Sequence, residues 1–183
     1  TALPLSAALA QTKEVTIAYQ DMVVPYRVAQ EAKELEKATG YKVNWKQFGG
    51  GGEVIKAMAS GAVQIGEVGS APIAAALSRG EPYELFWILD DIGDAEALVA
   101  KNGSGINTLA DLKGKKIAMP FNSTTHFHTM VALEQAKVNP ADVQILNMRP
   151  PEVRAAWARG DIHATFIWDP VLSEVKKDGK VIT

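Results

Sequence analysis

Three consecutive hydroxyl residues and a histidine stand at the start of a predicted helix. Ser123, Thr124, Thr125 and His126 follow the short apolar run Ile117–Met119, which predicts a strand. The first N–H groups of a helix have no partner inside the helix, and the helix dipole adds positive charge at the same end. A turn of this kind suits an oxyanion. One hydroxyl is expected to cap the helix, but three in a row exceed what a single cap requires.

A second turn of the same kind lies earlier in the chain. Gly69, Ser70, Ala71 and Pro72 open another predicted helix, directly after the apolar run Ile65–Val68. Proline is favoured in the first turn of a helix because the N–H that it lacks is not needed there. Ser70 fits a helix cap and a ligand donor equally well. Two such turns in one chain indicate that the protein holds a small anion.

Further candidates stand at the ends of predicted strands. In an α/β fold the ligand binds at the carboxyl ends of the parallel strands. Gln20 follows the first predicted strand, Val15–Tyr19, and Trp168 and Asp169 end a late one. Trp168 fits either the core or a wall against an alkyl chain, whereas Asp169 is expected to cap a helix first and bind ligand second. Glu96 begins the strand that joins the two halves, and it fits either an ammonium contact or a salt bridge at a hinge.

Other chemistries find less support in the sequence. His126 and His128 do not predict a metal site, because residues two apart on a helix point to nearly opposite sides. Ser123 with His126 resembles a nucleophile and its base, but no G-x-S-x-G turn or third group accompanies them. The Gly49–Gly52 run fits a flexible turn and lacks the dinucleotide fingerprint, because Val54 stands at the third glycine position. We therefore expect no catalytic residue, no metal and no cofactor, with an enzyme on the same fold as the alternative.

The composition is that of a globular protein with a substantial core. The 183-residue chain is 47% hydrophobic and 22% charged, contains no cysteine and has a formal net charge of −2. It has no run of Lys and Arg of the kind that binds phosphate backbones, so we expect no nucleic-acid partner. Residues 1–12 fit either the remnant of a secretory signal, with small residues at 8–10, or a disordered arm.

Alternating strand and helix patterns predict an α/β fold. Repeated βαβ units indicate mostly parallel sheets. Among other elements, the pattern assigns a helix to Tyr26–Lys37 and a strand to Tyr83–Leu89. We expect two lobes, residues 13–100 and residues 101–183, joined near Glu96–Gly105 with a cleft between them.

Several segments resemble the periplasmic solute-binding proteins of ABC importers, in the sulfonate, nitrate and taurine group. The resemblance extends over essentially Val15–Thr183. It is carried by VTIAYQ, ASGAVQIGEVGSAPIAAA, EALVAK, GKKIAMPFNSTTH and RPPEVRAAWARGDIHATFIWDPVLSEVKKDGKVIT. The combination of STTH with AAW and RGDI is typical of the taurine branch. The resemblance implies a two-lobed fold of type II that closes on its ligand like a hinged clamp, without catalysis.

The same resemblance implies a ligand, a location and a partner. We expect export to the periplasm, capture of taurine or a related alkanesulfonate, and delivery to an ABC permease in the inner membrane by a monomeric protein. The residues implied to surround the sulfonate are Ser70 and Ala71 in one lobe and Thr124, Thr125 and His126 in the other, with Gln20 and Trp168 completing the walls. The rival ligands are nitrate, bicarbonate, aromatic sulfonates and pyrimidine precursors, and a sensor domain is a further alternative.

Members of this group continue well beyond the point where this sequence stops. We therefore expect the C-terminal part of the first lobe to be missing from the chain. That part is also expected to supply acidic contacts to the amine of the ligand. Glu96 and Asp169 are then the candidates for this role in the sequence at hand.

Overall fold

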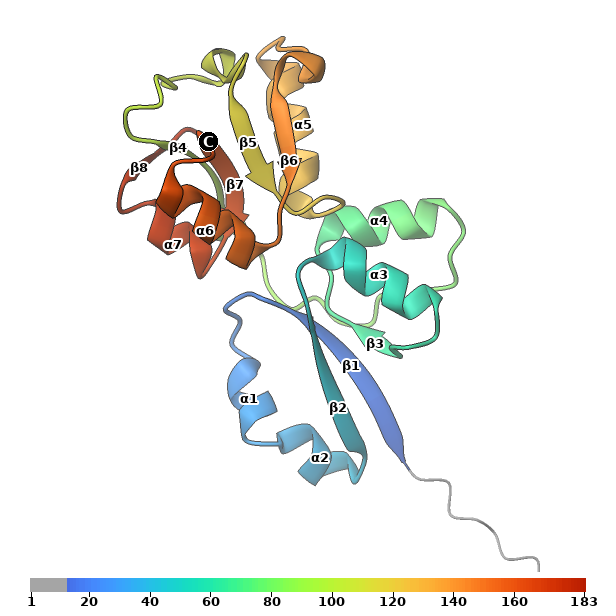
Figure 1. The fold of residues 1–183 in the computed structure, drawn as a ribbon. Coiled ribbons are helices and arrows are strands. Elements are labelled where there is room, and N and C mark those ends of the chain that lie inside the picture. Colours follow the sequence, from blue (N-terminus) through green and yellow to red (C-terminus); the bar gives the residue numbers. More distant parts are fainter. Residues whose placement is uncertain (1–12) are drawn as a thin grey trace, which may run out of the picture.

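The chain forms two β-sheets, each with its own helices. The structure is a computed structural model that describes residues 13–183, so the expected signal remnant at residues 1–12 lies outside the described residues. Figure 1 shows the two sheets in separate halves of the molecule, with α3 and α4 lying between them. Within the described residues, no helix is long and apolar enough to cross a membrane.

The first half contains a three-stranded parallel sheet in the order β2-β1-β3. Its strands are β1 (Glu14–Gln20), β2 (Lys42–Phe48) and β3 (Ile65–Gly66). Its helices are α1 (Arg27–Glu31), α2 (Glu34–Thr39), α3 (Gly51–Ala59) and α4 (Ser70–Ser78). Because the three strands run parallel, their carboxyl ends meet at one edge, and both α3 and α4 begin shortly after that edge.

The second half contains a five-stranded sheet in the order β6-β5-β7-β4-β8. Its strands are β4 (Glu96–Lys101), β5 (Lys116–Met119), β6 (Gln144–Asn147), β7 (Ala164–Trp168) and β8 (Gly179–Val181). Its helices are α5 (Thr124–Gln135), α6 (Pro150–Arg159) and α7 (Val171–Val175), and the short 3-10 turns are η1 (Gly93–Ala95), η2 (Leu109–Leu112) and η3 (Pro140–Asp142).

Strand β4 departs from the parallel pattern. It pairs antiparallel with β7 and with β8, whereas β5 pairs parallel with β6 and β7. The chain enters this sheet at β4, coming from the connection between the two halves, and β4 runs in the direction opposite to β7. As a result the first residue of β4, Glu96, lies opposite Trp168, the last residue of β7. Residues 96–100, which we assign to the first lobe from sequence, lie in the sheet of the second half.

The single helix expected over Tyr26–Lys37 is wrong, because the segment forms the two short helices α1 and α2. Lys33, between them, has a φ of 54°, a left-handed conformation that interrupts a helix. The break lets both parts contact the same side chain of β2. Tyr26 stacks on the ring of Trp45, and Glu36 accepts a hydrogen bond from the Trp45 indole N–H at 3.3 Å.

The strand expected over Tyr83–Leu89 is not formed. Residues 85–89, with the sequence LFWIL, are all exposed, with exposed fractions between 45% and 79%. A strand is stable only when a neighbouring strand satisfies its backbone groups and packs against its side chains. This segment has strand-like residues but no pairing partner among the described residues.

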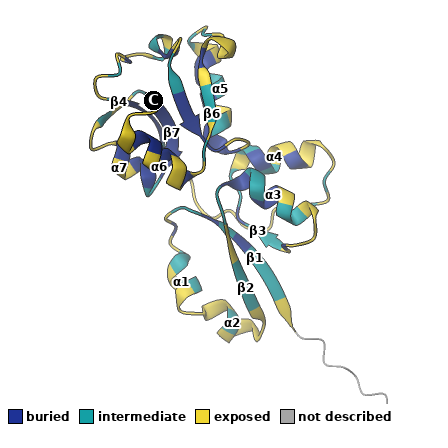
Figure 2. Ribbon diagram, viewed as in Figure 1, coloured by how far each residue is buried: buried dark blue, intermediate teal, exposed yellow. Residues whose placement is uncertain are grey.

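The two halves differ in how well their sheets are covered. The five-stranded sheet has a core on each face, one against α6 and α7 and the other against α5 and η2. The three-stranded sheet has a small core around Ala18, Val54 and Val63. Figure 2 shows the contrast: β7 and the inner faces of α6 and α7 are buried, whereas α1 and α2 contain no buried residue. The second half is therefore the firmer support for a site.

Candidate functional site

The two turns singled out from sequence meet in space. A Cβ atom on Gly69, at the start of α4, would lie 2.1 Å from Oγ1 of Thr124, at the start of α5. Real Cβ atoms do not approach a neighbour so closely, so only glycine fits here. Figure 1 shows α4 beside the loop that leads into α5. The N-terminal ends of a helix from each half thus converge on one point.

The two helix starts together offer several N–H donors. Gly69 is the N-cap of α4 and has no side chain to satisfy the first N–H groups, which belong to Ser70 and Ala71. In α5 the first two N–H groups belong to Thr124 and Thr125. N–H groups at these positions have no acceptor inside their own helix. Because both helix dipoles also point their positive ends here, the convergence has the electrostatics of an anion site.

The hydroxyl groups of α5 divide into structural and available ones. Oγ of Ser123 accepts a hydrogen bond from His126 N–H at 3.1 Å, so Ser123 is the cap. The Ser123 hydroxyl also donates to the carbonyl of Pro120 at 2.6 Å and lies 2.9 Å from Oγ1 of Thr125, which is fully buried. Thr125 can therefore donate only its backbone N–H to a ligand, whereas Thr124 can donate both its N–H and its hydroxyl.

His126 is held as a neutral imidazole. Its ring stacks on Phe121 with 4.6 Å between centroids, and its Nδ1 accepts the N–H of Asn122 at 3.4 Å. Burial lowers the pKa of His126, because desolvation disfavours the charged ring. With Nδ1 acting as acceptor, the proton of the neutral ring resides on Nε2, which makes His126 a hydrogen-bond donor without a positive charge.

The start of α3 is a third helix end at the same place; the sequence predicts a turn and a short helix here but assigns the turn no ligand contact. A Cβ on Gly51 would lie 2.6 Å from Cγ of Pro72, and a Cβ on Gly52 would lie 2.7 Å from Cβ of Asn122. The Gly49–Gly52 run is therefore a closely packed helix start and not merely a flexible turn. Four glycines between a strand and a helix are a signal of close backbone approach that could have been used.

Trp168 and Asp169 have different roles although they are neighbours. The Trp168 ring is 4% exposed and lies near the start of α3, and its indole N–H donates to the carbonyl of Asp21 in the first half at 2.8 Å. The Asp169 carboxylate accepts hydrogen bonds from the N–H and the hydroxyl of Ser173, at 2.9 and 2.5 Å. Asp169 lies one residue before the N-cap of α7, Pro170, and binds the first turn of that helix, so its Oδ1 is already occupied.

Gln20 is buried and held by two residues that the sequence did not single out. Its N–H donates to the Glu67 carboxylate at 3.3 Å, and its side-chain amide donates to the Glu67 carbonyl at 3.2 Å. Arg27 donates to the Gln20 carbonyl at 2.7 Å and to Glu67 at 3.2 Å. Tyr26 also donates to Glu67, and burial together with this bond raises the pKa of Tyr26. Glu67 is an acidic residue inside the otherwise apolar run Ile65–Val68, and this is the sequence signal that could have revealed the network.

Glu96 is a buried carboxylate close to the start of α5. Its side chain is 8% exposed, and its Oε2 atom has no hydrogen-bond partner among the described residues. The nearest basic group is Nδ1 of His128, at 3.7 Å from Oε2. Burial, with a smaller contribution from the charge of Asp90, raises the pKa of Glu96 to about 7.

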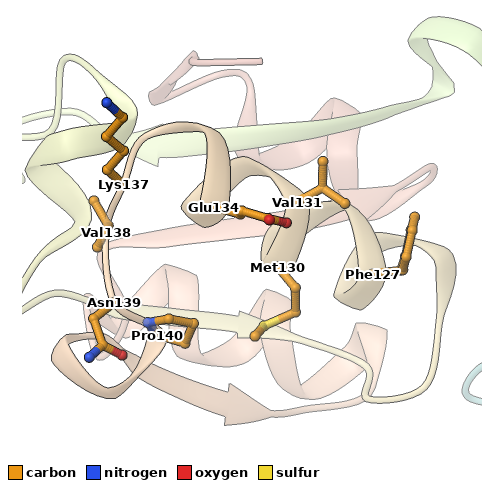
Figure 3. Close-up of a pocket in the computed structure, with 8 residues that line it drawn as sticks. All are labelled: Phe127, Met130, Val131, Glu134, Lys137, Val138, Asn139 and Pro140. Carbon is orange, nitrogen blue, oxygen red and sulfur yellow. The ribbon is translucent and has the colours of Figure 1, made fainter.

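A surface groove extends along α5 from Phe127, in its first turn, to the loop that follows the helix. It has a volume of about 590 Å³. Figure 3 shows the residues that line it, Phe127, Met130, Val131, Glu134, Lys137, Val138, Asn139 and Pro140. None of them is a residue predicted to bind ligand. Among residues 13–183, no group of three or more His, Cys, Asp and Glu is placed to hold a metal.

Comparison with known proteins agrees with this geometry. Residues 15–183 match the family described as "ABC transporter, phosphonate, periplasmic substrate-binding protein". The chain is 43% identical over its whole length to the taurine-binding periplasmic protein of Escherichia coli strain K12. The alkanesulfonate-binding protein SsuA from Xanthomonas axonopodis pv. citri, solved with bound MOPS, has a TM-score of 0.84 and 28% identity over 95% of this chain. The aliphatic sulphonate-binding protein SsuA of Escherichia coli has a TM-score of 0.71 and 29% identity over 94% of this chain.

The chain belongs to the family of periplasmic substrate-binding proteins of ABC transporters. The α/β fold and the two-lobed architecture expected from sequence are confirmed by the structural matches. These relatives are named as binding proteins and not as enzymes. The chain spans 56% of the length of the taurine-binding relative and about 60% of both solved proteins, 61% and 60%.

Proposed function

We propose that this chain forms the ligand-binding part of a periplasmic protein that captures taurine or a related alkanesulfonate. The protein then delivers the ligand to an ABC permease in the inner membrane, acting as a monomer and without a nucleic-acid partner. The observation that carries the proposal is the convergence of α4 and α5, where Gly69 touches Thr124. The identity to a taurine-binding protein supports the choice of ligand.

The chemistry of the convergence fits a sulfonate. A sulfonate is ionised at every physiological pH and accepts hydrogen bonds without donating any. The donors described above are backbone N–H groups, the Thr124 hydroxyl and a neutral His126, reinforced by helix dipoles. Such donors hold a singly charged anion without a full countercharge. They fit a monoanionic sulfonate better than a phosphonate, which carries more negative charge or a proton that needs an acceptor.

Calorimetry with taurine, methanesulfonate, sulfate and nitrate tests this proposal. We expect heat with both sulfonates at micromolar concentrations, since micromolar affinity corresponds to about −8 kcal/mol and is reasonable for an enclosed small ligand. Binding of nitrate or sulfate in preference to both sulfonates would replace the proposed ligand. If neither taurine nor methanesulfonate produces heat at millimolar concentration, the proposal is wrong.

The rival function, an enzyme on the same fold, would need a titratable group on a reacting atom. His126 is the candidate, and the substitution His126→Gln separates the two functions. A binding protein is expected to lose affinity modestly, because glutamine keeps a donor. An enzyme would lose turnover while still binding its ligand.

A further inference from the structure

A buried charged network lies behind Gln20 at the end of β1. The Glu67 side chain is 5% exposed and pairs with Arg27 at 3.2 Å. Oε2 of Glu67 also accepts hydrogen bonds from the Tyr26 hydroxyl and the Gln20 N–H. Oε1 of Glu67 is enclosed and accepts no hydrogen bond within residues 13–183. A buried ion pair with an unsatisfied oxygen is weak support for a fold, so stability alone does not explain the network.

Arg27 joins the parts of this network through the shape of its guanidinium group. Its Nη2 atom donates to the Gln20 carbonyl at 2.7 Å and to Glu67 at 3.2 Å, and its Nη1 atom donates to the Tyr26 hydroxyl at 2.8 Å. The guanidinium carbon lies 4.1 Å from the centre of the Tyr19 ring and 4.7 Å from that of Tyr26. Helix α1, which begins at Arg27, contains no buried residue. This side chain thus ties α1 to the end of β1 and to the loop after β3.

The network engages three of the four polar groups of Gln20. Its N–H and its side-chain Nε2 donate to Glu67, and its carbonyl accepts from Arg27. The side-chain amide is confined to this orientation, because the reverse would place two oxygen atoms against each other. Oε1 of Gln20 is therefore the atom left to interact with a ligand or with a water bound to it.

Gln20 lies where the two halves meet. The carbonyl of the next residue, Asp21, accepts the indole N–H of Trp168 from the second half at 2.8 Å. Glu67, which holds the Gln20 side chain, precedes the N-cap of α4, Gly69, by two residues. Gln20 is thus placed between a contact that joins the halves and a helix start that is proposed to hold the anion.

We propose that Arg27 and Glu67 are positioning residues for ligand binding and that they act through Gln20. The inference rests on the proposed function and adds to it two residues that do not themselves contact the ligand. The network holds Gln20 in one orientation before the ligand arrives. Binding then does not have to order this side chain, and the affinity is higher by the free energy that such ordering would cost.

A double-mutant cycle tests whether Glu67 acts through Gln20. We expect Gln20→Ala and Glu67→Gln each to lower taurine affinity by about three- to tenfold in calorimetry, the range of a single hydrogen bond. The double variant should bind taurine as Gln20→Ala does, because Glu67 then has no side chain to position. If Glu67 only supports the fold, the two losses add in the double variant.

The substitution Arg27→Lys separates the charge of the residue from its shape. Lysine keeps the positive charge but lacks the planar fork that reaches Gln20, Glu67 and Tyr26 together. We expect the same loss of taurine affinity as in Glu67→Gln, and no further loss when Gln20→Ala is already present. Because the Arg27 side chain is 24% exposed, this variant keeps the test available if Glu67→Gln does not fold.

Asp178→Asn is the matched control in the second half. Asp178 also joins a basic side chain and an aromatic one, since it accepts hydrogen bonds from Lys101 at 2.8 Å and from the Trp157 indole N–H at 2.6 Å. Lys101 is the last residue of β4, at the end of the strand opposite to Glu96. We expect this substitution to lower the thermal stability and to leave taurine affinity unchanged.

The outcomes distinguish this inference from the proposed function. If taurine binds to the unaltered protein but Gln20→Ala leaves its affinity unchanged, the positioning role is wrong while sulfonate capture stands. The same holds if the losses from Gln20→Ala and from Glu67→Gln or Arg27→Lys add. If neither taurine nor methanesulfonate binds to the unaltered protein, the proposed function fails and this inference fails with it.

Discussion

At the scale of single residues, the site is defined by which polar atoms already have partners inside the protein. Ser123 and Thr125 resemble ligand donors in the sequence, but their hydroxyls are joined to each other and Ser123 caps α5. Thr124, between them, has no recorded hydrogen bond to its hydroxyl within the described residues and lies against Gly69. The distinction cannot be made from residue types, because all three are small hydroxyl residues in one turn.

The substitution Thr124→Val tests the role of the hydroxyl. Valine keeps the size and branching of threonine, so the contact with Gly69 remains while the donor is lost. We expect sulfonate affinity to fall by roughly tenfold, from the loss of one hydrogen bond to a charged group, as measured by calorimetry. The matched control is Thr129→Val on the same helix, where the hydroxyl donates to the Thr125 carbonyl. Equal affinities for both variants would show that Thr124 does not contact the ligand.

The raised pKa of Glu96 predicts how the stability of the ligand-free protein depends on pH. Its pKa is raised from 4.5 to about 7 in the folded state, so the folded protein holds the proton more tightly than the unfolded chain. Stability from this group is therefore present at low pH and lost as the pH rises from about 4.5 through 7. The loss is on the order of 3 kcal/mol at most.

Urea denaturation at pH 5 and pH 8 measures this effect. The unaltered protein should lose more stability over that range than Glu96→Gln, because other titrating groups contribute equally to both proteins. Parallel stability profiles for the two proteins would mean that Glu96 is not a buried, destabilised carboxylate.

At the scale of elements, the helix starts could be predicted but their meeting could not. Small polar residues before an apolar-periodic segment indicate where α4 and α5 begin, and both helices begin there. Their contact depends on the path of the chain between the two sheets, which no local pattern encodes. The same limit explains why the antiparallel direction of β4 and the break at Lys33 were missed.

The substitution Gly69→Ala tests the contact between α4 and α5. Its Cβ would clash with Oγ1 of Thr124 at 2.1 Å, so the two helix starts must separate. Overpacking of this kind costs about 1–3 kcal/mol, and we expect ligand affinity to fall with it. Adding Thr124→Ala should restore the thermal stability, because it removes the clashing atom.

Gly50→Ala is the matched control for this experiment. Gly50 has a φ of 174°, which is extended backbone, and a Cβ there would be 3.4 Å from its nearest neighbour. The substitution Gly50→Ala should therefore leave the thermal stability nearly unchanged. If Gly69→Ala is as stable as Gly50→Ala, the helix starts do not meet as described.

At the scale of the whole molecule, the two halves are joined by contacts close to the site. Trp168 donates to Asp21 across the halves. On another side, Arg149 at the start of α6 pairs with Glu53 of α3 at 2.8 Å, and its aliphatic stem lies against Gly49. A ligand that contacts both halves stabilises the arrangement in which the halves touch. The contacts of Trp168 with Asp21 and of Arg149 with Glu53 stabilise the same arrangement.

Removal of the pair between the halves should weaken ligand binding from a distance. We expect Arg149→Ala and Glu53→Ala each to speed ligand release by roughly two- to fivefold, the range of an exposed ion pair. The double variant should be no worse than either single one, because the two residues act together. Arg154→Ala, which breaks an ion pair between α6 and α7 within one half, is the control. Release rates are measured by stopped flow. If the effects of the two single substitutions add in the double variant, Arg149 and Glu53 do not act as a pair.

The exposed run at residues 85–89 shows another limit of prediction from sequence at this scale. Its residues favour a strand, yet the described chain has no strand to pair with them. By contrast, the two-lobed α/β class follows from the alternation of strands and helices and from the family motifs. Class and helix starts are encoded locally, whereas pairing partners and contacts between the halves depend on the complete arrangement.

A crystal structure of the protein with taurine would test the central claim most directly. We predict that the sulfonate oxygens lie within about 2.7–3.2 Å of N–H groups at the starts of both α4 and α5. A sulfonate bound elsewhere, such as in the groove between Phe127 and Pro140 in Figure 3, or held by only one of the two helix starts, would contradict the account.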